Sequence, residues 1–430
     1  MAVVKFHVPD RGPDRDNNND DQDREYDEQI EDGSYDGSGG NDRSQSAGEA
    51  RRRKMTRKQK MSLLLRIAVF TCIMAAVIVF IIQQQSERVY SGSEFREVTT
   101  VTIPSAATCL NLGNNILIYS KDGASCMNQS GSTLWSISYE MQQPVVSVCG
   151  NIAAIGDYEG STVHILNATE GEVGTIATNM PLRTLSVASN GEVAAVLEDS
   201  ATTWIYIFDI QGNTIAYVKR TMEQSGYPIA VTLSPNGTLM CCSQLTVESS
   251  SVKTSVAFYN FGAVGQSETD RLVAGYDYEG EVAPYVRFLS NNVAVSVSDT
   301  RTTFYSGDEK PASGTNIFYK SDLEGVWSSD SYVALLFADP AGEEAYTLDI
   351  YNASGKEVGS IPFTMDYTSV QFFGDRVVID DGQSMLLYSV NGTLQYSGSM
   401  GDAVSLVLPS TSANRLTLVT KSSIKTMILK

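Results

Sequence analysis

The chain has 430 residues, with 50 Asp or Glu against 31 Lys or Arg and a formal net charge of −19. An acidic body of this kind repels nucleic acid, so we exclude a nucleic-acid-binding function for it. The six cysteines include no Cys-x-x-Cys pair. A disulfide framework is therefore not indicated, although a single bridge stays open if the body lies outside the cell.

The N-terminal segment, residues 1–60, differs from the rest of the chain in composition. Its first 49 residues hold 14 acidic and 5 basic side chains and few apolar ones. Such a segment cannot bury enough apolar surface to offset the entropy lost when a chain is ordered. We therefore expect a disordered tail here.

A basic cluster closes this tail. It consists of Arg51, Arg52, Arg53, Lys54, Arg57, Lys58 and Lys60. One interpretation is a nucleic-acid or nuclear-targeting patch. The other is the positive-inside rule, by which Lys and Arg beside a membrane span stay in the cytoplasm. The apolar run that follows directly favours the second, and the cluster should also attract anionic lipid headgroups.

Residues 61–82 are predicted to form one transmembrane helix. The stretch Ile67–Ile82 has no charged residue, and a helix of 22 residues reaches across a hydrocarbon core of about 30 Å. The run follows 60 residues and precedes the polar QQQSER, which offers no small-residue cleavage site, so it is an uncleaved signal anchor. This places the tail in the cytoplasm and everything after the linker 83–93 outside the cell membrane.

The body, residues 94–430, is a series of short strands rich in Val, Ile, Leu, Tyr and Thr, separated by Gly, Asn, Asp and Ser turns. One unit has strands at 145–149, 152–156 and 162–167 and a fourth after Gly171. The glycine of its last turn recurs at Gly131, Gly171 and Gly212. A four-stranded unit repeating at roughly 40–45 residues is the spacing of a β-propeller blade.

The number of blades follows from the first strand of each unit. Eight such strands begin near Thr108, Val145, Leu185, Ile229, Tyr285, Gly325, Ser369 and Val404. The last unit lacks a fourth strand, and residues 94–103 can supply it, closing the ring and removing an open sheet edge. We predict an all-β, eight-bladed propeller with closure by the N-terminal strand; seven blades stay an alternative because residues 244–330 are irregular.

These repeats resemble the quinoprotein-like and WD40-like propeller superfamily. Residues 131–135 (GSTLW) match its last-strand pattern, and residues 391–396 (NGTLQY) are a looser version. The layout as a whole is similar to the uncharacterised single-pass membrane propellers of Gram-positive, clostridial-type bacteria, a domain of unknown function. The chain has three Trp, fewer than quinone-binding members, and no metal-ligand cluster. No quinone, other cofactor or metal is therefore expected.

Aspartates recur at one position of the unit, the turn between its second and third strands. They are Asp122, Asp157, Asp199, Asp299, Asp339 and Asp381. These turns open on one face of a propeller, so the aspartates would form a negative ring able to attract a divalent cation or a cationic peptide. The alternative is that Asp is simply a favoured turn residue. The ring indicates the candidate binding face.

Catalytic signals are scarce. His164 is the one histidine of the body, and it is expected in mid-strand, so no catalytic residue is assigned and the chain is expected not to be an enzyme. Two segments depart most from the repeat, at residues 244–254 and 307–314. Insertions on a repeat scaffold often build a binding surface, and the alternative is loop variation that the fold tolerates.

We therefore expect a bitopic membrane protein whose extracytoplasmic propeller is a scaffold for protein–protein interaction in the cell envelope. Its partner would be another envelope protein or a cell-wall component. The alternatives are an envelope sensor that signals through the tail and, last, a propeller enzyme acting on a glycan or a quinone-linked substrate.

Overall fold

The computed structural model describes residues 66–75, 77, 88–200, 202–221, 226–248, 251–338 and 344–430. The chain divides into two compact units, Met1–Ala68 and Val69–Lys430. Residues 66–75 are helical. Among the residues described, no helix is both long and apolar enough to cross a membrane. The predicted tail, its basic cluster and both ends of the predicted span lie outside the described residues, so these stay predictions.

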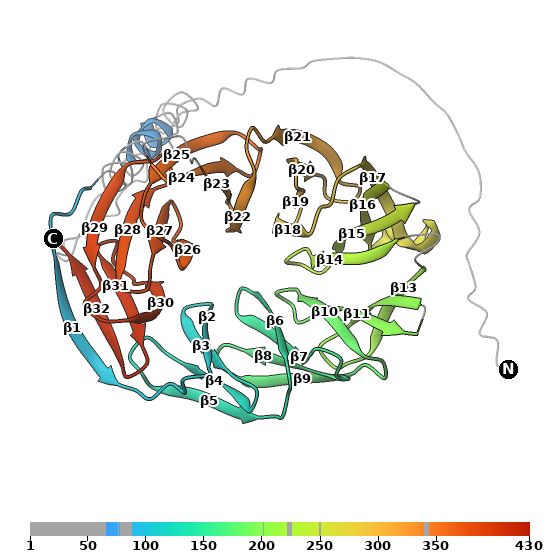
Figure 1. The fold of residues 1–430 in the computed structure, drawn as a ribbon, viewed down its shortest axis with the longest axis horizontal. Coiled ribbons are helices and arrows are strands. Elements are labelled where there is room, and N and C mark those ends of the chain that lie inside the picture. Colours follow the sequence, from blue (N-terminus) through green and yellow to red (C-terminus); the bar gives the residue numbers. More distant parts are fainter. Residues whose placement is uncertain are drawn as a thin grey trace, which may run out of the picture. The chain divides into compact units, whose positions relative to one another are not determined.

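The second unit is a ring of eight four-stranded antiparallel sheets, as the repeat count predicted (Figure 1). Seven blades follow the order of the chain, from β2-β3-β4-β5 to β26-β27-β28-β29. The eighth has the order β1-β32-β31-β30. The seven-bladed alternative is therefore wrong.

The strands are grouped here by their place in the blade. The first strands, which lie nearest the centre of the ring in Figure 1, are β2 (Thr108–Leu112), β6 (Pro144–Cys149), β10 (Leu182–Val187), β14 (Tyr227–Leu233), β18 (Tyr285–Ser290), β22 (Leu323–Ser328), β26 (Ser369–Phe372) and β30 (Val404–Pro409). The second strands are β3 (Asn115–Tyr119), β7 (Ile152–Asp157), β11 (Val193–Asp199), β15 (Leu239–Glu248), β19 (Val293–Val297), β23 (Tyr332–Ala338), β27 (Arg376–Asp380) and β31 (Arg415–Thr420).

The two outer positions complete each sheet. The third strands are β4 (Gly123–Met127), β8 (Thr162–Asn167), β12 (Thr202–Phe208), β16 (Ser251–Asn260), β20 (Arg301–Ser306), β24 (Tyr346–Asn352), β28 (Ser384–Ser389) and β32 (Ser423–Leu429). The outermost strands are β5 (Thr133–Ser138), β9 (Gly171–Ala177), β13 (Thr214–Thr221), β17 (Leu272–Glu279), β21 (Ala312–Phe318), β25 (Glu357–Phe363), β29 (Leu394–Ser399) and β1 (Ser93–Thr100).

Strand β1 closes the ring by pairing antiparallel with β32, from Ser93 opposite Leu429 to Thr100 opposite Ser423. Backbone hydrogen bonds extend this pairing at both ends, from Ser91 N–H to the carbonyl of Lys430 and from Val101 N–H to that of Ser422. The prediction that the N-terminal strand completes the last blade is confirmed. The unpaired edge that β32 would otherwise present is covered.

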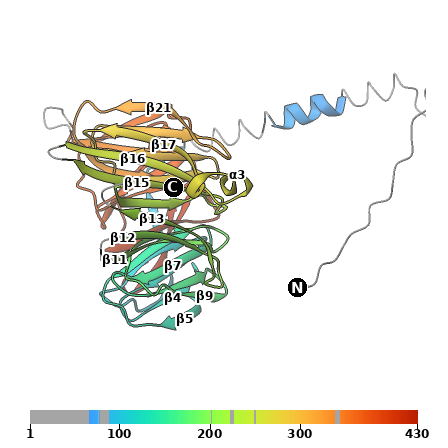
Figure 2. The same ribbon diagram turned by 90° about the vertical axis from the view of Figure 1, so that its right-hand side faces the viewer.

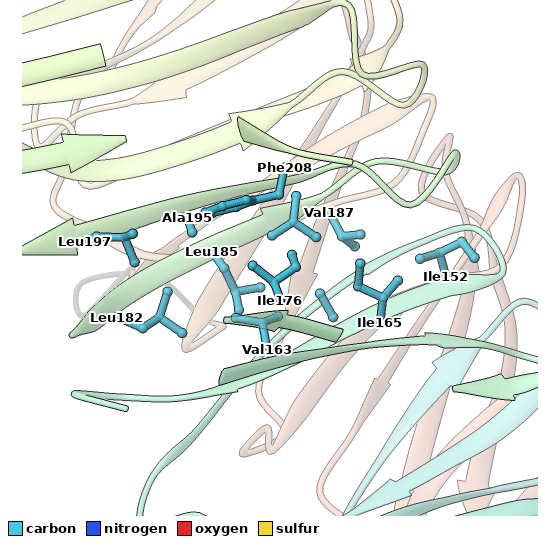
Figure 3. Close-up of a cluster of buried hydrophobic side chains, with 12 residues drawn as sticks. Ile152, Val163, Ile165, Ile176, Leu182, Leu185, Val187, Ala195, Leu197 and Phe208 are labelled. Carbon is cyan, nitrogen blue, oxygen red and sulfur yellow. The ribbon is translucent and has the colours of Figure 1, made fainter. Parts of the chain in front are cut away.

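The core is divided into eight apolar clusters, one at each boundary between neighbouring blades. Figure 3 shows the cluster between the second and third blades, where Ile165 and Ile176 of one sheet meet Leu185 and Leu197 of the next. Each blade packs against a neighbouring blade on both of its faces. This explains why β11 has apolar residues at successive positions. Ala195 points to one neighbouring blade and Val196 to the other.

The region between residues 244 and 330 departs from the prediction. Residues 244–248 and 251–254 are not a looped insertion, because they belong to β15 and β16, which pair from Leu239 opposite Asn260 to Glu248 opposite Ser251. Residues 307–314 form the β20–β21 connection and the start of β21. The insertion lies between β16 and β17 and holds α3 (Ala263–Gln266), labelled in the side view of Figure 2, and the 3-10 helix η1 (Thr269–Arg271).

Candidate functional site

The two faces of the ring carry different connections. Because the strands of a blade alternate in direction, the turns between second and third strands share one face with the links between blades. We call this the aspartate face. The turns between first and second strands, and those between third and fourth, lie on the opposite face. We call that the entry face because β1 begins there: Tyr90 N–H donates to the carbonyl of Gln395, near the start of the outer strand β29.

Five of the six predicted aspartates are found at the expected turns. Asp122 precedes β4, Asp157 ends β7, Asp199 ends β11, Asp299 precedes β20 and Asp381 follows β27. Asp339 lies outside the described residues. The placement agrees with the sequence analysis, whereas binding of a ligand by these side chains stays a prediction.

The carboxylates of three of these residues hold loops in place. Asp157 accepts backbone N–H groups of Gln142, at 3.0 Å, and of Gln143, at 2.7 Å. Asp299 accepts the N–H of Val282 at 3.1 Å. Each bond joins a turn to the link that enters the same blade.

Asp381 acts within its own turn, accepting N–H groups from Gln383 and Ser384 at 2.7 and 2.6 Å. Such bonds are typical of Asp in turns. Over the described part of the chain, no group of three or more His, Cys, Asp or Glu side chains is placed to hold a metal ion.

The aspartate face contains a cavity of about 540 Å³ between the fifth and sixth blades. Its apolar lining includes Val282, Tyr285, Val297, Leu323 and Val326. Val297 is buried, and Tyr285, Leu323 and Val326 are half-buried. Part of the apolar surface of Tyr285, Leu323 and Val326 therefore stays accessible in the cavity.

The rim of this cavity is acidic. Asp299, Asp322 and Glu324 line it, and all three are exposed. An apolar floor with carboxylates around it fits a guest that carries an apolar part beside a positive charge. We call this cavity the blade 5–6 pocket.

A buried ion pair supports one wall of the pocket. Glu281, which is 8% exposed, receives Arg301 Nε at 3.1 Å and the hydroxyl of Ser298 at 2.9 Å. The Arg301 guanidinium also lies 4.7 Å from the ring centre of Tyr278. Since Ser298 lines the pocket, this network fixes the position of its wall.

The pKa of Glu281 follows from this environment. Burial alone would raise the pKa, but hydrogen bonds from Arg301, Thr300 and Ser298 outweigh it and hold the pKa below its ordinary value. Glu281 is therefore ionised at neutral pH, and the Arg301 charge is compensated.

His164 lies in β8, as predicted, and its Nδ1 is 2.6 Å from Glu172 Oε1. Its ring stacks on Tyr139, with 5.5 Å between the ring centres. This is a cross-strand pair, since Glu172 lies in β9 beside it. This pairing gives His164 a structural role within the sheet.

Sequence reasoning found the aspartates but missed the blade 5–6 pocket. The pocket is assembled from three separate segments, residues 282–285, 297–299 and 322–326. None has an unusual composition, and only the alignment of blades brings them together. The sequence offered only a weak signal there, the two acidic residues Asp322 and Glu324.

The chain is similar in fold to several proteins of known structure. Solved structures with a similar fold include BamB from Moraxella catarrhalis, at 12% identity and a TM-score of 0.44 over 78% of this chain and 100% of that one. Sqt1 from Saccharomyces cerevisiae is similar at 9% identity and a TM-score of 0.47, over 80% and 99%. The computationally designed protein Ika8 is similar at 15% identity and 0.47, over 78% and 100%. No curated protein matches the chain.

A family model matches residues 86–429, which span the whole ring. Its description is a family of unknown function, DUF5711. The match covers most of the chain, and the chain belongs to this family.

Proposed function

We propose that this member of the family of unknown function DUF5711 is a single-pass membrane protein whose extracytoplasmic propeller is a non-enzymatic interaction module of the cell envelope. Its anchor is residues 61–82, preceded by the basic cluster 51–60. The helical residues 66–75 within that run carry no charge after Arg66, and only Thr71 and Cys72 among the others are not strongly apolar. A helix with apolar residues all round needs an apolar environment, and a bilayer supplies one.

The observation that carries the binding function is the blade 5–6 pocket, with its apolar floor and acidic rim. The partner would be a protein segment in which an apolar side chain is flanked by Lys or Arg. The apolar group fills the hollow, and the cations pair with Asp299, Asp322 and Glu324. The net charge of −19 favours a cationic partner in the same way, by steering its approach.

The direction of the tether supports this choice of face. The chain enters the ring at the entry face through Tyr90 and Ser91. Residues 83–92, which connect the proposed anchor to this point, reach at most about 35 Å when fully extended. The aspartate face is the face opposite this point of entry, so the tether is not attached where a partner would dock.

The test uses full-length protein in native membranes. Asp322→Lys with Glu324→Lys reverses two exposed rim charges, and Glu170→Lys with Glu357→Lys makes the same change at exposed positions on the entry face. Crosslinking and affinity capture should recover a partner with wild type and with the entry-face variant, and lose it with the rim variant. Equal recovery from all three proteins would rule out the pocket as the docking site.

A second measurement defines the chemistry of the partner. Peptides that alternate Leu with Lys should bind the purified full chain, and peptides that alternate Leu with Glu should not. Binding of the basic peptide should weaken as salt is raised, because the rim charges are exposed. The proposal fails if both peptides bind alike, or if neither binds.

A further inference from the structure

A second cavity is lined by the first strands of several blades, the strands that surround the centre of the ring in Figure 1. It has a volume of about 320 Å³ and is lined from β6, β10, β14 and β18 and from the β22–β23 turn. It shares no lining residue with the blade 5–6 pocket. We call it the axial cavity.

Hydroxyl groups of adjacent blades line the axial cavity. Ser147 Oγ accepts the backbone N–H of Val187 at 3.1 Å, and Ser186 Oγ accepts that of Leu233 at 3.0 Å. Each bond joins the first strand of one blade to that of the next. A hydroxyl that accepts in this way still has its own hydrogen to donate. These two hydrogens are available to a guest in the cavity.

Among the described residues that line the cavity, Arg287 of β18 is the one with a basic side chain. Its Nε is buried and has no hydrogen-bond partner within the described residues. The acidic residue of the lining, Asp330, is exposed at the β22–β23 turn, and no ion pair between it and Arg287 is found in the part of the chain that the structure describes. A guanidinium cannot lose its charge, and burying a donor without an acceptor is costly, so this site lacks an acceptor.

We propose that the axial cavity binds a small organic oxyanion, held by the Arg287 guanidinium and by the hydroxyls of Ser147 and Ser186. A guanidinium presents two parallel N–H groups that match the two oxygens of a carboxylate or a phosphate. The bound oxyanion would supply the acceptor that Arg287 Nε lacks. This function is separate from partner binding on the aspartate face.

A carboxylate suits the cavity better than a phosphate. Asp330 contributes a negative charge at the same cavity, and the chain as a whole carries −19. A doubly charged phosphate is repelled more strongly than a singly charged carboxylate. The volume of about 320 Å³ lies at the low end for ligand pockets, which limits the guest to a small molecule.

Cys149 supplies a reporter inside the site. It lines the axial cavity and is half-buried, whereas Cys109, Cys126, Cys241 and Cys242 are buried. Burial and the charge of Asp330 raise the pKa of the Cys149 thiol, and Arg287 opposes them. The thiol therefore reacts slowly, and a bound oxyanion shields it further.

The experiment measures modification of Cys149 by methyl methanethiosulfonate in the full chain in detergent, with peptide mass spectrometry separating it from Cys72. The probes are acetate and inorganic phosphate, with sodium chloride at equal ionic strength as the reference. Both probes should slow the reaction saturably, and acetate should act at the lower concentration. If neither slows it more than chloride does, the proposal is wrong.

Variants show whether protection depends on Arg287. In Arg287→Gln the concentration of acetate that gives half protection should rise at least about 10-fold, because a charge-assisted bidentate contact is lost. In Arg287→Lys, which keeps the charge but not the two parallel N–H groups, the concentration for half protection should lie between those of wild type and Arg287→Gln. Arg96→Gln, at an exposed position of β1, is the matched control and should behave as wild type. Unchanged protection in Arg287→Gln would overturn the assignment.

Thermal unfolding checks the folded state of these variants. Without added carboxylate or phosphate, Arg287→Gln should unfold at the same or a higher temperature than wild type, because it removes a charge that lacks an acceptor. A large loss of stability in this variant would show that Arg287 already has a structural partner and would argue against the site.

Discussion

Leu197 shows how the ring is stabilised at the level of single side chains. It is fully buried in the cluster between the second and third blades. We expect Leu197→Ala to lower the free energy of unfolding by about 2–5 kcal/mol, because it removes buried methyl groups and leaves a cavity. Leu394→Ala, at a position that is 41% exposed, is the matched control and should cost much less. Chemical denaturation of both variants provides the comparison, and equal losses would contradict it.

Asp380 at the end of β27 gives stability a dependence on pH. It is 4% exposed, and its Oδ2 has no hydrogen-bond partner within the described residues. Burial raises the pKa of this carboxyl above its ordinary value. Because the pKa is raised, ionisation of Asp380 costs stability at neutral pH; this cost shrinks as the pH falls below the folded-state pKa and is gone below the ordinary carboxyl pKa.

We therefore expect Asp380→Asn to stabilise the protein at pH 7 by about 1 kcal/mol, with the gain shrinking as the pH is lowered through the acidic range. Asp366→Asn, which makes the same change at an exposed position between β25 and β26, is the control and should leave stability nearly unchanged. Thermal unfolding between pH 4 and 8 measures both. A gain that does not depend on pH would show that ionisation of Asp380 is not its cause.

At the scale of the element, strand β1 decides whether the last blade is complete. A chain that begins at residue 88 keeps β1, and one that begins at residue 103 loses its pairing with β32. We expect the shorter chain to lose at least about 3 kcal/mol of unfolding free energy, because several backbone hydrogen bonds are removed together. It should also self-associate through the open edge of β32.

Light scattering coupled to size-exclusion chromatography, with denaturation in parallel, tests both expectations. The chain that begins at residue 88 is the control and should stay as stable as the intact propeller. If the two chains are equally stable and equally monomeric, ring closure by β1 contributes little.

Elements were the most predictable level. Turn residues such as Gly171 and Gly212 mark the blade repeat because these positions have φ of +86° and +82°, which glycine adopts without strain. The strand that closes the ring was also predictable, since a unit with three strands needs a fourth. Residues 244–248 and 251–254 were predicted to be part of an insertion because they depart from the repeat, whereas the pairing of β15 with β16 makes them strand.

For the whole molecule, the two faces of the ring were predictable and the pockets were not. The position of the aspartates follows from strand alternation alone. The blade 5–6 pocket and the axial cavity depend on how neighbouring blades pack, and that is set by side-chain volumes at distant positions such as Tyr285 and Leu323. A single sequence does not reveal such an arrangement.

The proposed topology makes a prediction for the intact cell. With the tail inside and the propeller outside, protease added to spheroplasts should reach the body and spare an epitope tag placed before residue 49. Detergent-lysed cells are the control, in which both parts should be exposed to protease. Protection of residues 94–430 in intact spheroplasts would reverse the orientation.

Ring closure by β1 also has a consequence in time. Ser91 and Lys430, which lie together at the end of the last blade, are 339 positions apart in the chain. At about 5–20 residues per second, roughly 20–70 s of synthesis separate the emergence of β1 from that of its partner. During that interval β1 has no strand to pair with, while the blades between it and β32 are synthesised. The ring can close only after β32 has left the ribosome.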